Sequence, residues 1–378
     1  MIDQNRGRLY QLLWLVAICV EFPVNMVARI NGHPEWNRHV MYRALSEGYL
    51  ELFRGQFHKK VIKSLRITPK GIDYIGVKDY TLVPLIAQNM DRYYQSHSGL
   101  DKVMLYHNHA VAMVMAANAG AHFLPDDKPA INLGGKAESI PIDPMASYYY
   151  SAWEVRRVMR AVSPHTTPKV SRLEGIIIHG EHCYLIYYAG SHQMHWYYGT
   201  EKNLESTIDT TLNQRGFRVR TYHQIVIGST FTVAKRICGH PVDEHGRYYS
   251  VSSDYASCNF IMNNAQGDEL LAMIIDPERT RDVTRSILRN YKVPEVRSRD
   301  YDAVTLDGLQ PVIVNYQFDM LSLLETPLSI YGFRYSPIIL CYEYQAQAIR
   351  EIVDAQLEVR TIAGGDYERT PTEGTGPP

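Results

Sequence analysis

The order of apolar and polar runs in the first 75 residues constrains this chain more than any other feature. The sequence predicts, in order, three helical segments and two short strands, at 9–19, 24–30, 35–47, 49–53 and 61–67. Phe22-Pro23 and the turn at 31–34 separate the helices, and Gly48 ends the third. The loop 54–60 between the strands is rich in basic residues. Three helices followed by a basic two-stranded hairpin are typical of a winged helix-turn-helix, a module that inserts one helix into a DNA groove.

Candidate DNA contacts lie on the third helix and on the hairpin. Side chains of a recognition helix reach phosphates or base edges, and a basic hairpin can follow a phosphate backbone. The residues predicted to bind DNA are Asn37, Arg38, His39, Tyr42, Arg43, Arg54, His58, Lys59, Lys60, Lys63 and Arg66. We expect Arg38 to read base edges, because it lies nearer the N-terminal half of the helix, and Arg43 to bind a phosphate. The alternative is a protein–protein module whose basic loop is only solvated.

Charge is unevenly distributed along the chain. Residues 1–75 hold eleven Lys and Arg against six Asp and Glu, a net charge of +5, whereas the rest holds 28 against 34, a net charge of −6. From this split we expect polyanion binding to be confined to the N-terminus. The five cysteines are scattered without a C-x-x-C pair, which is typical of a cytoplasmic protein with reduced thiols. The apolar run 12–20 is too short to span a bilayer, so we expect a buried helix rather than a signal peptide, and no membrane partner.

The pattern changes beyond residue 76. We predict a winged helix-turn-helix domain over 1–76, a helical connector over 77–143, an α/β scaffold domain over 144–362 and a disordered tail over 363–378. The strongest helix of the connector covers 100–119, where Val111, Met113 and Met115 are expected to be core. In 144–362 short apolar runs alternate with helical stretches, which predicts an α/β or α+β layer fold.

Two patterns raise the question of catalysis. Residues 153–208 have the element order of a restriction-endonuclease-like core, with Glu154 on a helix and Glu181 after the second strand. Such a core holds Mg²⁺ through an acidic residue on the second strand and an acid-x-Lys on the third, but the third strand here reads Tyr-Leu-Ile-Tyr-Tyr. His107-Asn108-His109 is similar to the two-histidine motif of relaxases, yet its middle residue is polar and it leads into a helix. We therefore predict a degenerate nuclease-like fold with no catalytic residue and no metal. Because no nucleotide-binding motif occurs, we also predict no cofactor.

Three stretches of sequence carry a resemblance to a known family. They are Tyr42-Arg43-x-Leu45-x-x-Gly48-Tyr49-Leu50, Leu65-Arg66-Ile67-Thr68-Pro69-Lys70-Gly71, and Ser171-Arg172-Leu173-Glu174-Gly175 with Tyr184-Leu185-Ile186-Tyr187-Tyr188. With them, residues 8–360 resemble the replication-relaxation family of plasmids and integrative conjugative elements. The resemblance implies a winged helix followed by a domain related to the restriction-endonuclease fold. It also implies a DNA-binding accessory of plasmid or element replication or transfer.

From these features we predict a non-enzymatic DNA-binding protein of a mobile element involved in plasmid replication or conjugation. The winged helix is expected to bind double-stranded DNA. The α/β body is expected to serve as a scaffold for a second copy of the chain or for a relaxase or replication protein. Two alternatives stay open: a metal-dependent nuclease or nickase with an atypical site, and a winged-helix transcription regulator whose body senses a ligand.

Overall fold

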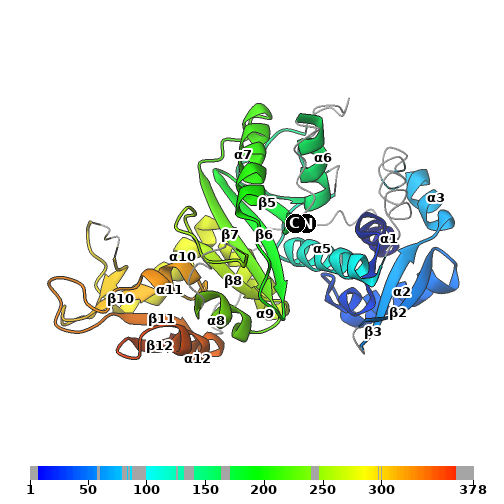
Figure 1. Ribbon diagram of the computed structural model, residues 1–378. Coiled ribbons are helices and arrows are strands. Elements are labelled where there is room, and N and C mark those ends of the chain that lie inside the picture. Colours follow the sequence, from blue (N-terminus) through cyan, green and yellow to red (C-terminus); the bar gives the residue numbers. More distant parts are fainter. Residues whose placement is uncertain are drawn as a thin grey trace, which may run out of the picture.

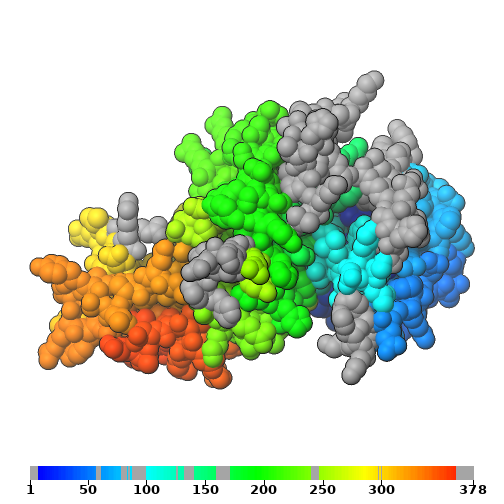
Figure 2. Space-filling model, in the orientation of Figure 1, coloured from blue at the N-terminus to red at the C-terminus, as the bar shows by residue number. Residues whose placement is uncertain are grey.

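The computed structural model describes residues 7–57, 60–78, 83, 86, 99–124, 127–131, 140–162, 171–239, 247–296, 298 and 300–362. Over these residues the chain is a mixed α/β protein with three sheets. The N-terminal segment lies at one end of the molecule, a five-stranded sheet in the middle, and a four-stranded C-terminal sheet at the other end (Figure 1, Figure 2).

The N-terminal segment has the predicted helical segments and hairpin in the predicted order, together with a short strand at Phe22–Pro23 that was predicted only as a break between helices. It contains α1 (Gly7–Cys19), β1 (Phe22–Pro23), the 3-10 helix η2 (Val24–Arg29), α2 (Pro34–Ser46), β2 (Leu50–Phe57), β3 (Lys60–Ile67) and α3 (Pro69–Lys78). Its strands form an antiparallel sheet in the order β1-β3-β2. The helical run predicted at 24–30 is a 3-10 helix, a form used where only a turn or two fit between breaks.

The hairpin is longer than the sequence pattern predicted. β2 runs to Phe57 and β3 begins at Lys60, with these two residues opposite each other. Arg54, expected in the loop 54–60, therefore lies in β2, directly across from Lys63. Hydrogen bonds between the two backbones keep these polar residues extended. The pattern of side chains in the sequence does not show such bonds, so the strands were predicted too short. His58 and Lys59 lie outside the described residues.

The central sheet has the order β4-β5-β6-β7-β8. Its strands are β4 (Ser147–Ser151), β5 (Leu173–His179), β6 (His182–Gly190), β7 (Thr221–Gly228) and β8 (Cys258–Met262). β4, β5 and β6 are antiparallel neighbours, whereas β6, β7 and β8 run parallel. The helices of this part are α5 (Leu100–Asn118), α6 (Ala152–Val162), α7 (Tyr198–Gln214), α8 (Phe231–Gly239) and α9 (Ala265–Ile274).

Side chains alternate between two separate cores on the two faces of this sheet. Tyr149 and Ile177 pack with α5 and α9 in one hydrophobic cluster. Their strand neighbours Tyr150 and Ile176 pack with α6 and α7 in the other. The sheet thus separates the N-terminal side of the molecule from the side that carries α7.

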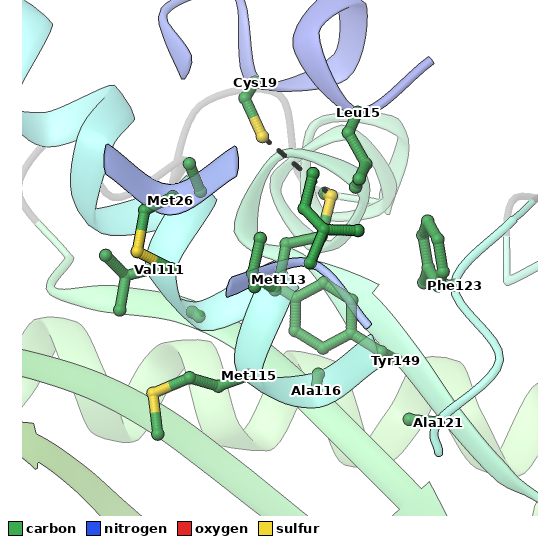
Figure 3. Packing of buried hydrophobic residues seen from close by; sticks show 14 of the residues in the cluster. Leu15, Cys19, Met26, Val111, Met113, Met115, Ala116, Ala121, Phe123 and Tyr149 are labelled. Atoms are coloured by element: carbon green, nitrogen blue, oxygen red, sulfur yellow. Dashed lines mark hydrogen bonds between the residues drawn. The ribbon is translucent and has the colours of Figure 1, made fainter. Parts of the chain in front are cut away.

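Helix α5 is a core helix rather than a connector. On one side it contacts α1, β1, η2 and β2, and on the other it contacts β4, β5, β6 and α9. Val111, Met113 and Met115 are buried, as predicted, and Cys19 Sγ lies 3.9 Å from Met113 Sδ (Figure 3). One cluster runs from α1 through α5 into the central sheet, so the predicted boundaries at 76 and 143 do not coincide with a break in the core.

The C-terminal part forms a sheet of its own, whereas a single α/β domain was expected over 144–362. Its order is β12-β11-β10-β9, from β9 (Ala303–Val304), β10 (Pro311–Val314), β11 (Ile338–Tyr342) and β12 (Glu358–Ile362). The helices here are α10 (Pro277–Ile287), η5 (Leu288–Asn290), α11 (Met320–Glu325) and α12 (Glu343–Ile352). β10, β11 and β12 are parallel. A backbone bridge between Asn259 and Asp319 joins this part to the edge of the central sheet.

Candidate nucleic-acid interface

Helix α2 presents a polar and aromatic face to solvent. Pro34 stands in its first turn, where the missing N–H costs nothing. Val40, Met41 and Ala44 are buried and attach the helix to the core. The predicted residues Arg38, His39, Tyr42 and Arg43 are all exposed.

The exposed face of α2 also carries Trp36, which was not among the predicted DNA contacts and which stacks on the predicted residue His39. Trp36 is 57% exposed and Tyr42 63% exposed. The Trp36 ring stacks on His39 with 5.7 Å between ring centroids. Trp36 and His39 are three residues apart, a spacing that places both rings on one face of a helix and is visible in the sequence. Whether that face is exposed depends on where the core lies.

Two ion pairs orient the arginines of α2. Arg38 pairs with Glu35, and Arg43 Nε lies 2.6 Å from Glu47 Oε1. The hydrogen bond that Arg43 donates to Glu47 raises the pKa of Arg43. Exposed pairs of this kind contribute little to stability, so a phosphate could replace either carboxylate at small cost.

Asn37 does not belong to this surface. It is buried, and its Nδ2 donates to Ile30 O at 2.6 Å. The side chain thereby closes the turn between η2 and α2. The prediction that Asn37 contacts DNA was wrong, because the helix rotates this position toward the core.

The hairpin supplies a pair of like charges. Arg54 and Lys63 are directly opposite in the register and both are exposed. Among the described residues neither has a carboxylate partner. Like charges directly opposite destabilise a hairpin, so folding alone gives no reason for the pair. Lys60 begins β3 at the tip of the same hairpin.

Arg66 has a structural role instead of the predicted one. Its guanidinium lies 2.6 Å from Oε1 of the buried Glu21 and 3.9 Å from the centroid of the Phe53 ring. A buried carboxylate needs such a partner, and this ion pair occupies the guanidinium that was expected to meet a phosphate.

The two sides of the hairpin have different neighbours. Ser64 points to α5, where its Oγ lies 2.6 Å from His107 Nε2. Arg54 and Lys63 alternate with Ser64 and therefore point to the other side. Leu50 and Leu65 share that other side and belong to the same core cluster as Val40 and Met41 of α2. The basic pair and the outer face of α2 are thus supported by one continuous core.

The residues considered for a nuclease site are not brought together. Glu154 accepts a 2.8 Å hydrogen bond from Ser151 N and pairs with the buried Lys128 at 2.6 Å. Glu181 lies in the turn after β5 and pairs with Arg220 at 3.2 Å. The two carboxylates lie beyond opposite ends of β4, a strand whose ends are about 13 Å apart.

The described histidines and acidic residues form no metal centre. No group of three or more His, Cys, Asp or Glu side chains in the described ranges is arranged to hold a metal ion. His107 and His109 lie on α5 rather than on a strand and have different partners, Ser64 and Glu174. Burial lowers the pKa of His107 to about 4, so this residue is neutral at pH 7.

No family model matches this chain, and searches of curated proteins and of solved structures find none that matches. In the part of the chain that the structure describes, no helix combines the length and the apolar character needed to cross a bilayer.

Proposed function

We propose that residues 7–78 form a winged helix-turn-helix that binds double-stranded DNA. In this proposal α2 enters the major groove with Arg38, His39, Tyr42 and Arg43, and the β2–β3 hairpin follows the phosphate backbone. The observation that carries the proposal is the exposed pair Arg54 and Lys63, which face each other across the hairpin without a carboxylate partner among the described residues. A polyanion would relieve the repulsion between them.

We further propose that the protein is a non-enzymatic accessory of plasmid or conjugative-element replication or transfer, as the family resemblance implies. In this role the central and C-terminal sheets act as a scaffold for a second copy of the chain or for a relaxase or replication protein. The separation of Glu154 from Glu181 supports a role without catalysis.

Duplex binding is tested by fluorescence anisotropy with the full-length protein and a labelled random-sequence duplex. The double substitution Arg54→Gln, Lys63→Gln should weaken binding about tenfold at low salt and flatten the slope of log K against log salt by roughly two units. Arg218→Gln, an exposed arginine on the central part of the chain, is the matched control and should change neither. Equal affinity of the double variant and wild type would refute the placement of the interface.

Catalysis is tested by incubating the protein with supercoiled plasmid and Mg²⁺ or Mn²⁺. No nicking is expected. Reproducible nicking that is lost in Glu154→Gln or Glu181→Gln, with an unchanged circular dichroism spectrum, would establish the nuclease alternative. Glutamine is used at position 154 because it retains much of the hydrogen bonding to Ser151.

Deleting the gene separates the accessory role from the regulator alternative. Reduced conjugation or plasmid maintenance with unchanged transcript levels is expected. A change confined to transcription would favour a regulator whose body senses a ligand.

A further inference from the structure

A groove of about 690 Å³ opens beside the start of α7, away from the proposed duplex interface. It is lined by His195, Trp196, Tyr197, Tyr198, Gly199, Thr200, Asn203 and Arg247. Trp196 belongs to the hydrophobic cluster on the α6 and α7 face of the central sheet. The groove is therefore on the opposite side of this sheet from α5, which contacts the N-terminal segment.

Two distant stretches of chain build the floor of the groove. Trp196 N donates to Arg247 O at 2.8 Å, and Tyr249 N donates to Met194 O at 2.9 Å. The Trp196 and Tyr249 rings are buried and pack edge-on with 4.9 Å between centroids. These contacts hold the lining residues in place, so the groove is preformed.

Exposed rings lie on this floor. Tyr197 is 45% exposed and Tyr198 57% exposed. His195 stacks on Tyr248 with 4.9 Å between ring centroids. Flat rings that are exposed on a rigid support are stacking platforms, and every nucleobase offers a face of the same kind.

The described lining of the groove carries one positive charge, and the acidic side chains Asp254 and Glu205 nearby are both paired with Lys202. Arg247 is exposed and is the one charged side chain among the described lining residues. The nearby Asp254 accepts from Tyr198 Oη at 3.4 Å, but it is already paired with Lys202 Nζ at 2.9 Å. Asn203 and Thr200 add hydrogen-bonding groups without charge.

We propose that this groove binds unpaired nucleotides of single-stranded DNA, with a base stacked on Tyr198 and a neighbouring phosphate at Arg247. The proposal rests on the DNA-binding function proposed above and extends it, because replication and transfer both expose single strands. A duplex at α2 and an unpaired strand in the groove use opposite sides of the central sheet, so one molecule can hold both at once.

The test uses full-length protein and three labelled probes: oligothymidylate, an abasic oligonucleotide of the same length, and a duplex. Wild type should bind oligothymidylate more tightly than the abasic probe, because only the former has bases to stack. Tyr198→Leu should weaken oligothymidylate binding about five- to a hundredfold, and Tyr198→Phe should stay within about twofold of wild type, since the ring is kept. Arg247→Gln should weaken both single-stranded probes. Tyr331→Leu, at a fully exposed tyrosine of the C-terminal part, is the matched control and should have no effect.

Three results would overturn the proposal. The first is unchanged oligothymidylate binding in Tyr198→Leu, and the second is equal affinity of wild type for the abasic probe and oligothymidylate. The third comes from a variant of the hairpin. The double variant Arg54→Gln, Lys63→Gln keeps this test distinct from that of the duplex interface. Loss of oligothymidylate binding in this variant, with the groove intact, would place single-strand binding on the hairpin and refute the groove. Failure of duplex binding alone would refute only the function proposed for α2.

Discussion

Arg29 at the end of η2 is the residue whose substitution we expect to show how the N-terminal segment is attached to the body. Its Nη2 lies 2.6 Å from Asp268 Oδ1 and 3.1 Å from Asn264 O, and its Nη1 donates to Asn263. Asn118 Nδ2 completes the cluster with 2.8 Å bonds to Asp268 Oδ2 and to Arg29 O. The cluster therefore joins η2, α5 and the start of α9.

The cost of removing the guanidinium follows from the burial of its partner. The side chains of Arg29 and Asp268 are 21% and 13% exposed. Breaking a buried ion pair costs about 3–5 kcal/mol, and partial exposure together with the remaining bond from Asn118 reduces this. We expect Arg29→Met to lower the free energy of unfolding by about 2–4 kcal/mol, because it leaves the carboxylate of Asp268 without its cation. Asp268→Asn should change it by less than about 1 kcal/mol, because burial raises the pKa of Asp268 and so already disfavours its charged form. The double variant should lose about 1–2 kcal/mol less free energy of unfolding than the sum of the two single variants. The reason is that Asp268→Asn removes the carboxylate charge that Arg29→Met leaves without a partner.

Urea unfolding followed by circular dichroism measures these differences, with unchanged m-values as the check that one transition is compared. Additivity of the two substitutions within about 0.5 kcal/mol would refute the coupling. The pH dependence gives a second readout. Burial raises the pKa of Asp268 in the folded state, in spite of Arg29. The stability contributed by this group is therefore present below the unfolded pKa near 3.8 and is lost as pH rises through the folded pKa. Asp268→Asn should remove this fall.

Three further predictions follow from single positions. Arg38→Ala should lower the preference for a selected DNA site over a scrambled duplex by about 1–3 kcal/mol, whereas Arg43→Ala should weaken binding to the two duplexes equally. In competition binding, an unchanged ratio of the two affinities for Arg38→Ala would show that another face of the protein reads the bases. His107 has a pKa of about 4 in the folded protein against 6.5 when free, so about 3 kcal/mol of stability should be lost as pH falls from 6.5 to 4. His107→Gln should flatten that part of the pH profile of unfolding. A profile unchanged from wild type would contradict the buried, neutral state of His107. Gly267→Ala would place a Cβ on a backbone oxygen of the preceding strand and should destabilise the protein by about 2 kcal/mol or more. Gly239→Ala, where no atom of the described residues would contact the new Cβ, should not, and thermal unfolding distinguishes the two variants.

Short-range pattern was enough for the helices α1, α2 and α5 and for the presence of the hairpin. The helix at 34–46 was predicted over 35–47, because a turn precedes it, apolar residues recur near helical spacing and Gly48 ends it. Pro34 had been assigned to the turn and is instead the first residue of the helix. The length of the hairpin was not predicted, because the residues of loop and strand are equally polar there. Similarly, the apolar runs after residue 144 indicated strands but not that they divide between two sheets, since strand partners are chosen by packing across the chain.

The candidate sites depend on contacts that no local pattern contains. Asn37 and Arg66 are residue types that often meet DNA, yet the core and the buried Glu21 decide that they face inward. Arg29 is an ordinary basic residue until Asp268, 239 positions later, lies beside it. The groove exists only because the strand of chain at Trp196 pairs with that at Arg247. The periodicity of apolar residues shows which side of one helix or strand faces the core, and it therefore predicts single helices and strands well. The partner of a polar side chain is settled only when distant segments close around it, because burial is what makes an unpaired charge or amide costly.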